Sequence, residues 1–269
     1  MIYHTKLVCL VCLIASYKHE FKDSIMKQLQ SRKHFKILVA CEESQNVASR
    51  FYNLGYTVYS CDIQASSNKQ YRHIHLSSDV FTVLETFRDI DITFDCVLAF
   101  PPCTYLAHVG NRWLNDSINY PNRHLDRELA TRFFMKLWNI DKSFNVKHVM
   151  LENPKGYIQS FFDKSDYHYI QPFEYGEYAS KKTCLFTKNL PTLKPTKLLI
   201  EQDERKFTEY FSKLRSKKKR SEFFKGVSTA IAKQYDEYFN SVYRFKQDST
   251  KTYDNRDFDL SIFEELTVK

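Results

Sequence analysis

Short apolar runs alternate with segments of helical periodicity from residue 36 onward. Lys36–Cys41 is a nearly continuous apolar run, typical of a strand buried inside a parallel sheet. In the next segment apolar residues recur at helical spacing, at Val47, Phe51 and Leu54. Gly55 is a residue type that commonly follows the end of a helix, and the β-rich run 56–61 comes directly after it. These segments together predict a βαβ unit.

The alternation continues through the middle of the chain. A strand-like run at 73–76 precedes a helical segment at 80–87, and an amphipathic helix is expected at 127–140 between strands at 94–100 and 146–151. Strands alternating with helices in this way predict an α/β fold with a doubly wound sheet. Such sheets bind ligands at the carboxyl ends of their strands, so polar residues at those ends are candidates for a site.

The pattern changes beyond Pro172. Residues 173–187 predict a hairpin, 198–220 a polar helix and 227–239 a closing amphipathic helix. We therefore expect an N-terminal extension at 1–35, one main domain at 36–246 and a polar tail at 247–269.

Composition and charge narrow the class of protein. Of 269 residues, 43% are hydrophobic and 16% aromatic, which excludes a largely disordered chain. The formal charge of +8 favours a polyanionic partner such as DNA or RNA. Seven cysteines without regular spacing do not predict a disulfide framework, so a reducing compartment, the cytoplasm, is expected.

The apolar run at residues 7–14 is too short for a transmembrane helix, which needs about 20 apolar residues. A signal peptide and an appended helix are the two alternatives, and the poor cleavage site favours the helix. Cys9 and Cys12 lie within this run without a second ligand pair, so no zinc site and no other metal is expected.

Cys103 follows Pro101-Pro102 at the end of the strand expected at 94–100. A thiol in a rigid turn there suits a nucleophile, and a following turn or helix start would lower its pKa. The alternative is a small packing residue. Glu152 ends the next strand, and a carboxylic acid near a pyrimidine N3 would favour thiolate attack at C6. Its alternative is a capping or solvated Glu before Asn-Pro.

The residues around Pro-Pro distinguish two kinds of base methylation. Enzymes that methylate exocyclic amines carry Asp, Asn or Ser before Pro-Pro and an aromatic residue after it. Here these positions hold Phe100 and Cys103, so the amine-holding carbonyl is absent and a nucleophile is present. The pattern therefore favours methylation of carbon over methylation of nitrogen.

Several longer segments carry a family resemblance over residues 36–240. They are KILVACEESQNVASRFYNLGYTVYSCDI, FDCVLAFPPCTYLAHVGNRW, LENPKGYIQSFF, IQPFEYGEYASKKTCLFTKNLPTLKPT and RSEFFKGVSTAIAKQY. In these segments the chain resembles the small DNA (cytosine-5) methyltransferase-like proteins of phages and prophages. The resemblance implies a Rossmann-like methyltransferase sheet, S-adenosylmethionine as cofactor, and DNA with a flipped cytosine as substrate.

The resemblance also implies roles for individual residues. Cys103 is the implied nucleophile, Glu152 the N3 partner, and Lys182 a basic catalytic residue that helps to hold the base. Asp62 is implied to bind the ribose hydroxyls of the cofactor and Asp79 its adenine amine. The further cofactor-binding candidates are Cys41, Glu42, Glu43, Ser44, Ile63 and Pro101. The further substrate-binding candidates are Pro102, Asn111, Arg112, Lys181, Thr183 and Gly226.

Two features depart from the typical family pattern. The cofactor loop at 40–46 contains no glycine, so close backbone approach to the cofactor is less assured, and Glu42, Glu43 or Ser44 are expected near the methionine end. The region 187–225, where typical enzymes carry a target-recognition lobe, is reduced. Asn111 and Arg112, with Trp113 and the basic run 217–220, are candidates to contact DNA in its place.

The sequence thus predicts a monomeric cytosine-5 methyltransferase of the cytoplasm of a bacterial or phage-infected cell. Two alternatives stay open. One is a pyrimidine-modifying enzyme that acts on a nucleotide or on RNA. The other is a non-catalytic nucleic-acid-binding relative that has lost cofactor binding.

Overall fold

The computed structural model describes residues 32–199 and 223–243. The apolar run at 7–14, the basic run at 217–220 and the polar tail lie outside the described residues. The predicted polar helix at 198–220 and much of the reduced recognition region lie outside them too.

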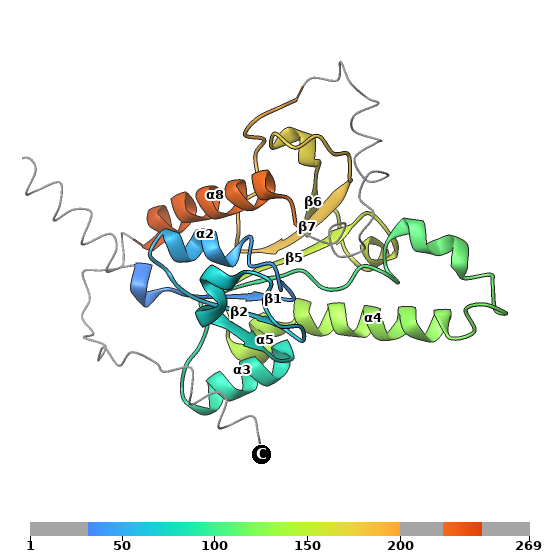
Figure 1. The fold of residues 1–269 in the computed structure, drawn as a ribbon, viewed down its shortest axis with the longest axis horizontal. Coiled ribbons are helices and arrows are strands. Elements are labelled where there is room, and N and C mark those ends of the chain that lie inside the picture. The colour runs from blue at the N-terminus through green and yellow to red at the C-terminus, as the bar shows by residue number, and fades with distance from the viewer. Residues whose placement is uncertain (1–31, 200–222, 244–269) are drawn as a thin grey trace, which may run out of the picture.

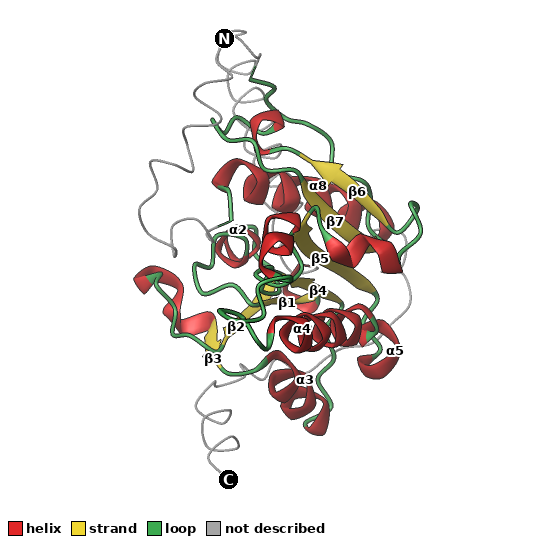
Figure 2. Ribbon diagram, turned by 90° about the vertical axis from the view of Figure 1, so that its right-hand side faces the viewer, coloured by secondary structure: helices red, strands yellow, loops and turns green. Residues whose placement is uncertain are grey.

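A seven-stranded sheet forms the centre of the molecule (Figures 1 and 2). Its strands are β1 (Lys36–Ala40), β2 (Thr57–Asp62), β3 (His75–Ser77), β4 (Cys96–Ala99), β5 (His148–Pro154), β6 (Tyr167–Ile170) and β7 (Thr183–Lys188). They lie in the order β3-β2-β1-β4-β5-β7-β6. The first five strands pair in parallel, and β7 runs antiparallel to both β5 and β6.

This sheet confirms the predicted fold class, a doubly wound, Rossmann-like methyltransferase sheet. The chain moves outward from β1 to β2 and β3, and then crosses to β4 on the other side of β1. The topological switch point therefore lies between β1 and β4, where sheets of this kind bind ligands.

Helices cover both faces of the sheet (Figure 1). One face carries α2 (Ala48–Asn53) and α8 (Lys225–Tyr243), and the other carries α3 (Val80–Asp89), α4 (Arg123–Trp138) and α5 (Ile140–Phe144). Short 3-10 helices lie in the connections, at Lys69–Ile74, His108–Trp113, Tyr157–Phe161 and Pro172–Glu174. Alternate residues of β1 enter two separate cores: Ile37 and Val39 face α2 and α8, whereas Leu38 and Ala40 face the other layer.

The hairpin predicted within 173–187 is wrong in its first strand. The partner of β7 is β6, which precedes the 3-10 turn at Pro172–Glu174. β6 has only four residues, and Ile170 alone is buried among them, so its sequence lacks a clear alternation of apolar and polar positions.

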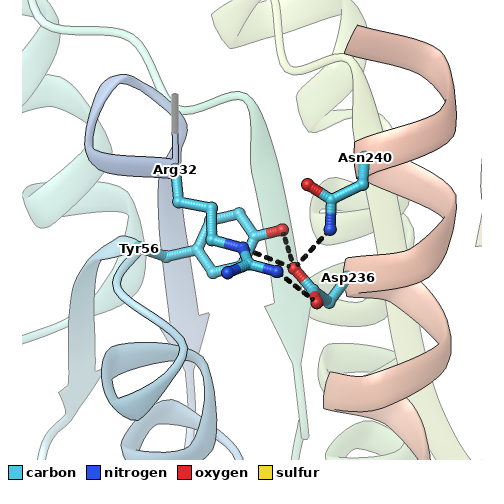
Figure 3. A network of polar contacts seen from close by, with 4 residues as sticks. All are labelled: Arg32, Tyr56, Asp236 and Asn240. Atoms are coloured by element: carbon cyan, nitrogen blue, oxygen red, sulfur yellow. Dashed lines mark hydrogen bonds and ion pairs between the residues drawn. The ribbon is translucent and has the colours of Figure 1, made fainter. Parts of the chain in front are cut away.

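A polar network joins the segment before β1 to α8 (Figure 3). Arg32 donates to both carboxylate oxygens of Asp236, at 2.8 and 2.7 Å, and the hydroxyl of Tyr56 donates to Asp236 Oδ1 at 2.7 Å. Asn240 donates to the same oxygen at 3.0 Å. Phe35 packs against Phe239, with ring centroids 4.5 Å apart. The last residues of the predicted extension 1–35 therefore contact the main domain.

Candidate active site

The candidate residues gather at the carboxyl edge of the sheet. Cys41 follows β1, Asp62 ends β2, Asp79 follows β3, Cys103 follows β4 and Glu152 lies near the end of β5. These strands are parallel, so their carboxyl ends share one edge, with the switch point between Cys41 and Cys103. The structure therefore brings together the residues that the sequence analysis selected at strand ends.

The loop after β1 takes glycine-like turns without glycine. Cys41 and Gln45 have φ angles of 59° and 54°, in the left-handed region that costs most residues about 1–2 kcal/mol. The fully buried Gln45 side chain stabilises this loop: its amide donates to Ser60 Oγ at 2.9 Å and to the Tyr71 carbonyl at 2.8 Å. Ser66 donates to the Gln45 amide oxygen at 2.5 Å.

Glu42 points its carboxylate at the start of α2. Its two oxygens accept the backbone N–H groups of Val47 and Ala48, at 2.6 and 3.1 Å. Val47, the N-cap residue, makes no side-chain cap itself, so Glu42 satisfies the free N–H groups of this helix. Burial raises the pKa of Glu42 to about 7, although these two N–H groups act in the opposite direction. Glu43 and Ser44 then remain the loop candidates for the methionine end of a cofactor.

Two carboxylates and one exposed apolar side chain define the side of the edge near β2. Asp62 Oδ1 accepts the N–H of Gln64 at 2.8 Å, and Ile63 is 81% exposed. Asp79 caps α3, since its Oδ1 accepts the N–H groups of Phe81 and Thr82 at 2.9 and 3.4 Å. Both acids raise the pKa of Cys41, after the larger effect of burial, so all three lie in one electrostatic environment.

The Pro-Pro-Cys segment forms a tight turn rather than the start of a helix. Pro101 is buried and Pro102 exposed. The Cys103 carbonyl accepts the N–H groups of Leu106 and Ala107, at 3.1 and 2.9 Å. Burial raises the pKa of the Cys103 thiol, Lys181 lowers it and Glu152 raises it, with a net increase. The lowered pKa expected from the sequence is therefore wrong for this structure, because burial of the thiol outweighs the turn.

Glu152 is a buried acid beside a single cation. It is 6% exposed, and its Oε1 atom has no hydrogen-bond partner among the described residues. The Lys181 ammonium lies 4.0 Å from this oxygen. Burial raises the pKa of Glu152 and Lys181 lowers it, with a net increase. The carboxyl group can thus hold a proton and present it to a hydrogen-bond acceptor that enters the site.

The two neighbouring lysines differ in what they face. Lys181 contacts Glu152 and acts electrostatically on Cys103, whereas the Lys182 ammonium lies 4.3 Å from the centre of the Tyr169 ring. Thr183 is buried, and its hydroxyl donates to the Lys181 carbonyl at 3.0 Å. Lys181, which the sequence analysis placed among substrate contacts, is therefore the lysine of the Cys103–Glu152 pair.

We expect Lys181→Gln to slow alkylation of Cys103 by iodoacetamide several-fold at neutral pH and to move its pH dependence upward. The reason is that the Lys181 charge lowers the pKa of the thiol. Mass spectrometry of the peptide that contains Cys103 measures the rate. Lys182→Gln is the matched control, and an equal slowing in both variants would refute a specific role for Lys181.

The Cys103 turn and the Glu152 segment are joined by backbone contacts. His108 N–H donates to the Lys155 carbonyl at 3.1 Å, and Tyr157 N–H donates to the Leu106 carbonyl at 2.8 Å. Gly156 lies between them, where an added Cβ would come within 2.0 Å of the Leu106 oxygen. Only glycine permits this approach. The sequence analysis missed Gly156, although its position four residues after Glu152 was a usable signal.

Gly156→Ala is expected to separate these two segments. The clash is with backbone atoms, so the change should destabilise the protein by about 1–3 kcal/mol. A displacement of the order of 1 Å at a site costs about 10²-fold in rate, so methyl transfer should fall by that order. Chemical denaturation and initial rates measure both effects.

Gly55→Ala is the control for this prediction. Gly55 has φ 89° in the turn between α2 and β2, on the amino side of the sheet. A side chain there strains the backbone, so stability should fall by about 1 kcal/mol while the rate is kept. Equal losses of rate in the two variants would contradict a positioning role for Gly156.

Two arginines of α4 hold the loop that follows Cys103. Arg123 donates to the Thr104 carbonyl at 2.9 Å. Arg127 donates to the Tyr105 carbonyl at 2.9 Å and to Asn111 Oδ1 at 2.5 Å. The sequence analysis missed both, because nothing in a helical pattern shows which loop an arginine will reach.

Three substrate-binding candidates have local roles in the structure. Asn111 is engaged by Arg127, and Arg112 lies over the Trp113 ring, 4.5 Å from its centre. Gly226 starts α8 against the turn at Tyr175–Glu177: its N–H donates to Glu177 Oε1 at 2.6 Å, and an added Cβ would lie 2.1 Å from the Tyr175 oxygen.

Among residues 32–199 and 223–243, no group of three or more His, Cys, Asp or Glu side chains could hold a metal ion. No helix within the same ranges combines the length and apolar character needed to cross a membrane.

Comparison with known proteins gives one distant structural likeness. No family model and no curated protein matches the chain. A crystal structure of a prophage-encoded E. coli protein, described as a DNA modification methyltransferase, matches with a TM-score of 0.41 and 14% sequence identity. The match covers 61% of this chain and 52% of that chain, so the chain spans about half the length of its neighbour. The sheet and its edge define the fold, and the functional proposal rests on the residues described above.

Proposed function

We propose that this protein is an S-adenosylmethionine-dependent methyltransferase that acts on C5 of cytosine in DNA. The observation that carries the proposal is the buried Glu152 carboxyl group, beside Lys181 and at the same sheet edge as Cys103. A buried acid with an unpaired oxygen is costly unless a ligand uses it. A nucleophilic thiol at the same edge gives that acid a purpose in pyrimidine chemistry.

The residues near β1, β2 and β3 fit the cofactor. Asp62 at the end of β2 is placed to accept hydrogen bonds from ribose hydroxyls, as acids at this position do in Rossmann-like sheets. Ile63 offers an exposed apolar side chain to an adenine ring, and Asp79 a carboxylate to its amine. The left-handed turns at Cys41 and Gln45 give the loop the backbone shape that glycines usually supply.

The chemistry assigns one step to each residue. Cys103 loses its proton, and its sulfur forms a bond to C6 of cytosine while Glu152 protonates N3. Electron density then moves to C5, which becomes nucleophilic. When bound, S-adenosylmethionine supplies the methyl group that C5 takes. Loss of the C5 proton and cleavage of the C6–sulfur bond restore the aromatic ring and release Cys103, and N3 returns its proton to Glu152.

Lys181 and the held turn support these steps. The raised pKa of Cys103 means that the resting thiol is protonated at neutral pH, so the Lys181 charge is needed to favour the thiolate during attack. The backbone contacts at Gly156 fix the Cys103 turn relative to Glu152, which provides the orientation that bond formation at C6 requires.

The test is methyl transfer from tritiated S-adenosylmethionine to unmodified DNA, with RNA and free cytidine nucleotides in parallel. Digestion and mass spectrometry should find 5-methylcytosine in DNA. Label on an exocyclic amine would contradict carbon methylation, and label in RNA or nucleotides alone would favour the alternative substrates. Calorimetry with S-adenosylmethionine tests cofactor binding, which should be lost in Asp62→Ala. A complete absence of binding to the unmodified protein would favour the non-catalytic alternative.

A further inference from the structure

Exposed aromatic side chains with cations beside them lie around the outer rim of the proposed site. Tyr157, Phe161 and Tyr169 are 39%, 47% and 40% exposed. The Arg127 guanidinium lies 4.8 Å from the centre of the Tyr157 ring, and the Lys182 ammonium lies 4.3 Å from that of Tyr169. We call Tyr157, Phe161 and Tyr169 the aromatic strip.

The strip is continuous with the Cys103–Glu152 pair. Tyr157 and Phe161 have ring centroids 5.2 Å apart, in an edge-on arrangement. Between them in sequence, Gln159 donates to Cys184, which is paired with Tyr169 across β6 and β7. On its inner side, Tyr157 N–H bonds the Leu106 carbonyl of the Cys103 turn.

Cations extend the strip on both sides. Lys155 is exposed, and its N–H bonds the carbonyl of Lys182. Arg127 links the strip to Asn111, next to Arg112 and its partner Trp113. Exposed rings interleaved with cations suit a nucleic-acid strand whose bases stack on the rings while its phosphates meet the charges. A paired duplex keeps its bases stacked on one another and offers the rings no base face.

We propose that the aromatic strip binds unpaired nucleotides that flank the target cytosine, so that the protein prefers single-stranded over duplex DNA. This inference rests on the proposed function, since it takes DNA as the substrate of the same site. It names the form of that DNA. It also explains how a chain with a reduced recognition region holds its substrate, because stacking needs no element that enters a major groove.

Fluorescence anisotropy with three labelled 20-nucleotide probes tests the proposal at one fixed salt concentration. The probes are a single strand, the duplex of the same sequence, and a strand of abasic sites that keeps only sugar and phosphate. The single strand should bind most tightly. The double substitution Tyr157→Leu and Phe161→Leu should weaken its binding by roughly 5- to 150-fold for each stacked base that is lost. Binding of the abasic strand should stay unchanged.

Tyr52→Leu is the matched control, because Tyr52 is 40% exposed on α2 and lies outside the strip. Thermal melting of each variant reports its folding. Equal affinity for the abasic and the normal strand would overturn the proposal, as would tighter binding of the duplex. Methylation of duplex DNA with no preference for single strands would refute the strip and leave the proposed function intact. Strip-dependent binding of single strands without any methyl transfer would do the reverse.

Discussion

Cys103→Ala is expected to abolish methyl transfer to DNA while the protein still binds S-adenosylmethionine. Removal of a covalent nucleophile lowers rates on the order of 10⁴-fold or more. The proposed mechanism has no other route to activate C5, because the covalent bond at C6 makes that carbon nucleophilic. Transfer of tritium to DNA measures the rate, and calorimetry measures cofactor binding.

Trapping adds a positive readout for the same residue. DNA that contains 5-fluorocytosine cannot lose fluorine as a proton from C5, so the bond from Cys103 to C6 should persist and give a stable protein–DNA adduct. The adduct should require S-adenosylmethionine and be absent in Cys103→Ala and Cys103→Ser. Undiminished label transfer in Cys103→Ala would eliminate the covalent mechanism. Because Cys103 is only partly buried, thermal stability should change little, which separates loss of chemistry from loss of folding.

Glu152→Gln is expected to lower the methylation rate by about 10²- to 10⁴-fold, the range associated with general acid catalysis. Glutamine keeps the shape of the side chain and can donate a hydrogen bond to N3, but it cannot transfer a proton. In the unmodified protein, activity should fall as pH rises through the raised pKa of Glu152, because the acid form is then lost. That decline should be missing from the residual activity of the variant.

Stability supplies the control for Glu152. A buried acid with a raised pKa contributes stability that is present below its unfolded pKa and is lost as pH rises through its folded pKa. Glu152→Gln removes this loss, so the variant should be as stable as the unmodified protein or more stable above neutral pH, as measured by denaturation at several pH values. A variant that was both inactive and less stable would indicate a structural role for Glu152 instead.

The framework of the site could be predicted from the sequence because parallel strands place their carboxyl ends along one edge. Once Lys36–Cys41 and the β-rich run after Gly55 were assigned as strands, Cys41 and Asp62 had to be neighbours. The same reasoning placed Cys103 beside Glu152. These predictions depend on apolar runs long enough to identify, and on a topology that leaves few alternatives.

What the sequence could not provide depends on packing between distant segments. The direction of the Cys103 pKa shift follows from burial of the thiol and from Lys181, which lies 78 positions later in the numbering. Whether Lys181 or Lys182 faces Glu152 depends on which face of the chain each occupies next to β7. The contacts of Arg123 and Arg127 depend on where the loop after Cys103 folds back. None of these leaves a local pattern in the sequence.

The loop after β1 has a consequence for how such proteins are identified. Its left-handed turns at Cys41 and Gln45 are stabilised by hydrogen bonds of the Gln45 side chain to Ser60, Ser66 and Tyr71. The information that usually resides in glycines is here distributed over polar partners up to 26 residues away. A sequence signature written in glycines does not find this loop, whereas one written in backbone angles and buried amide contacts does.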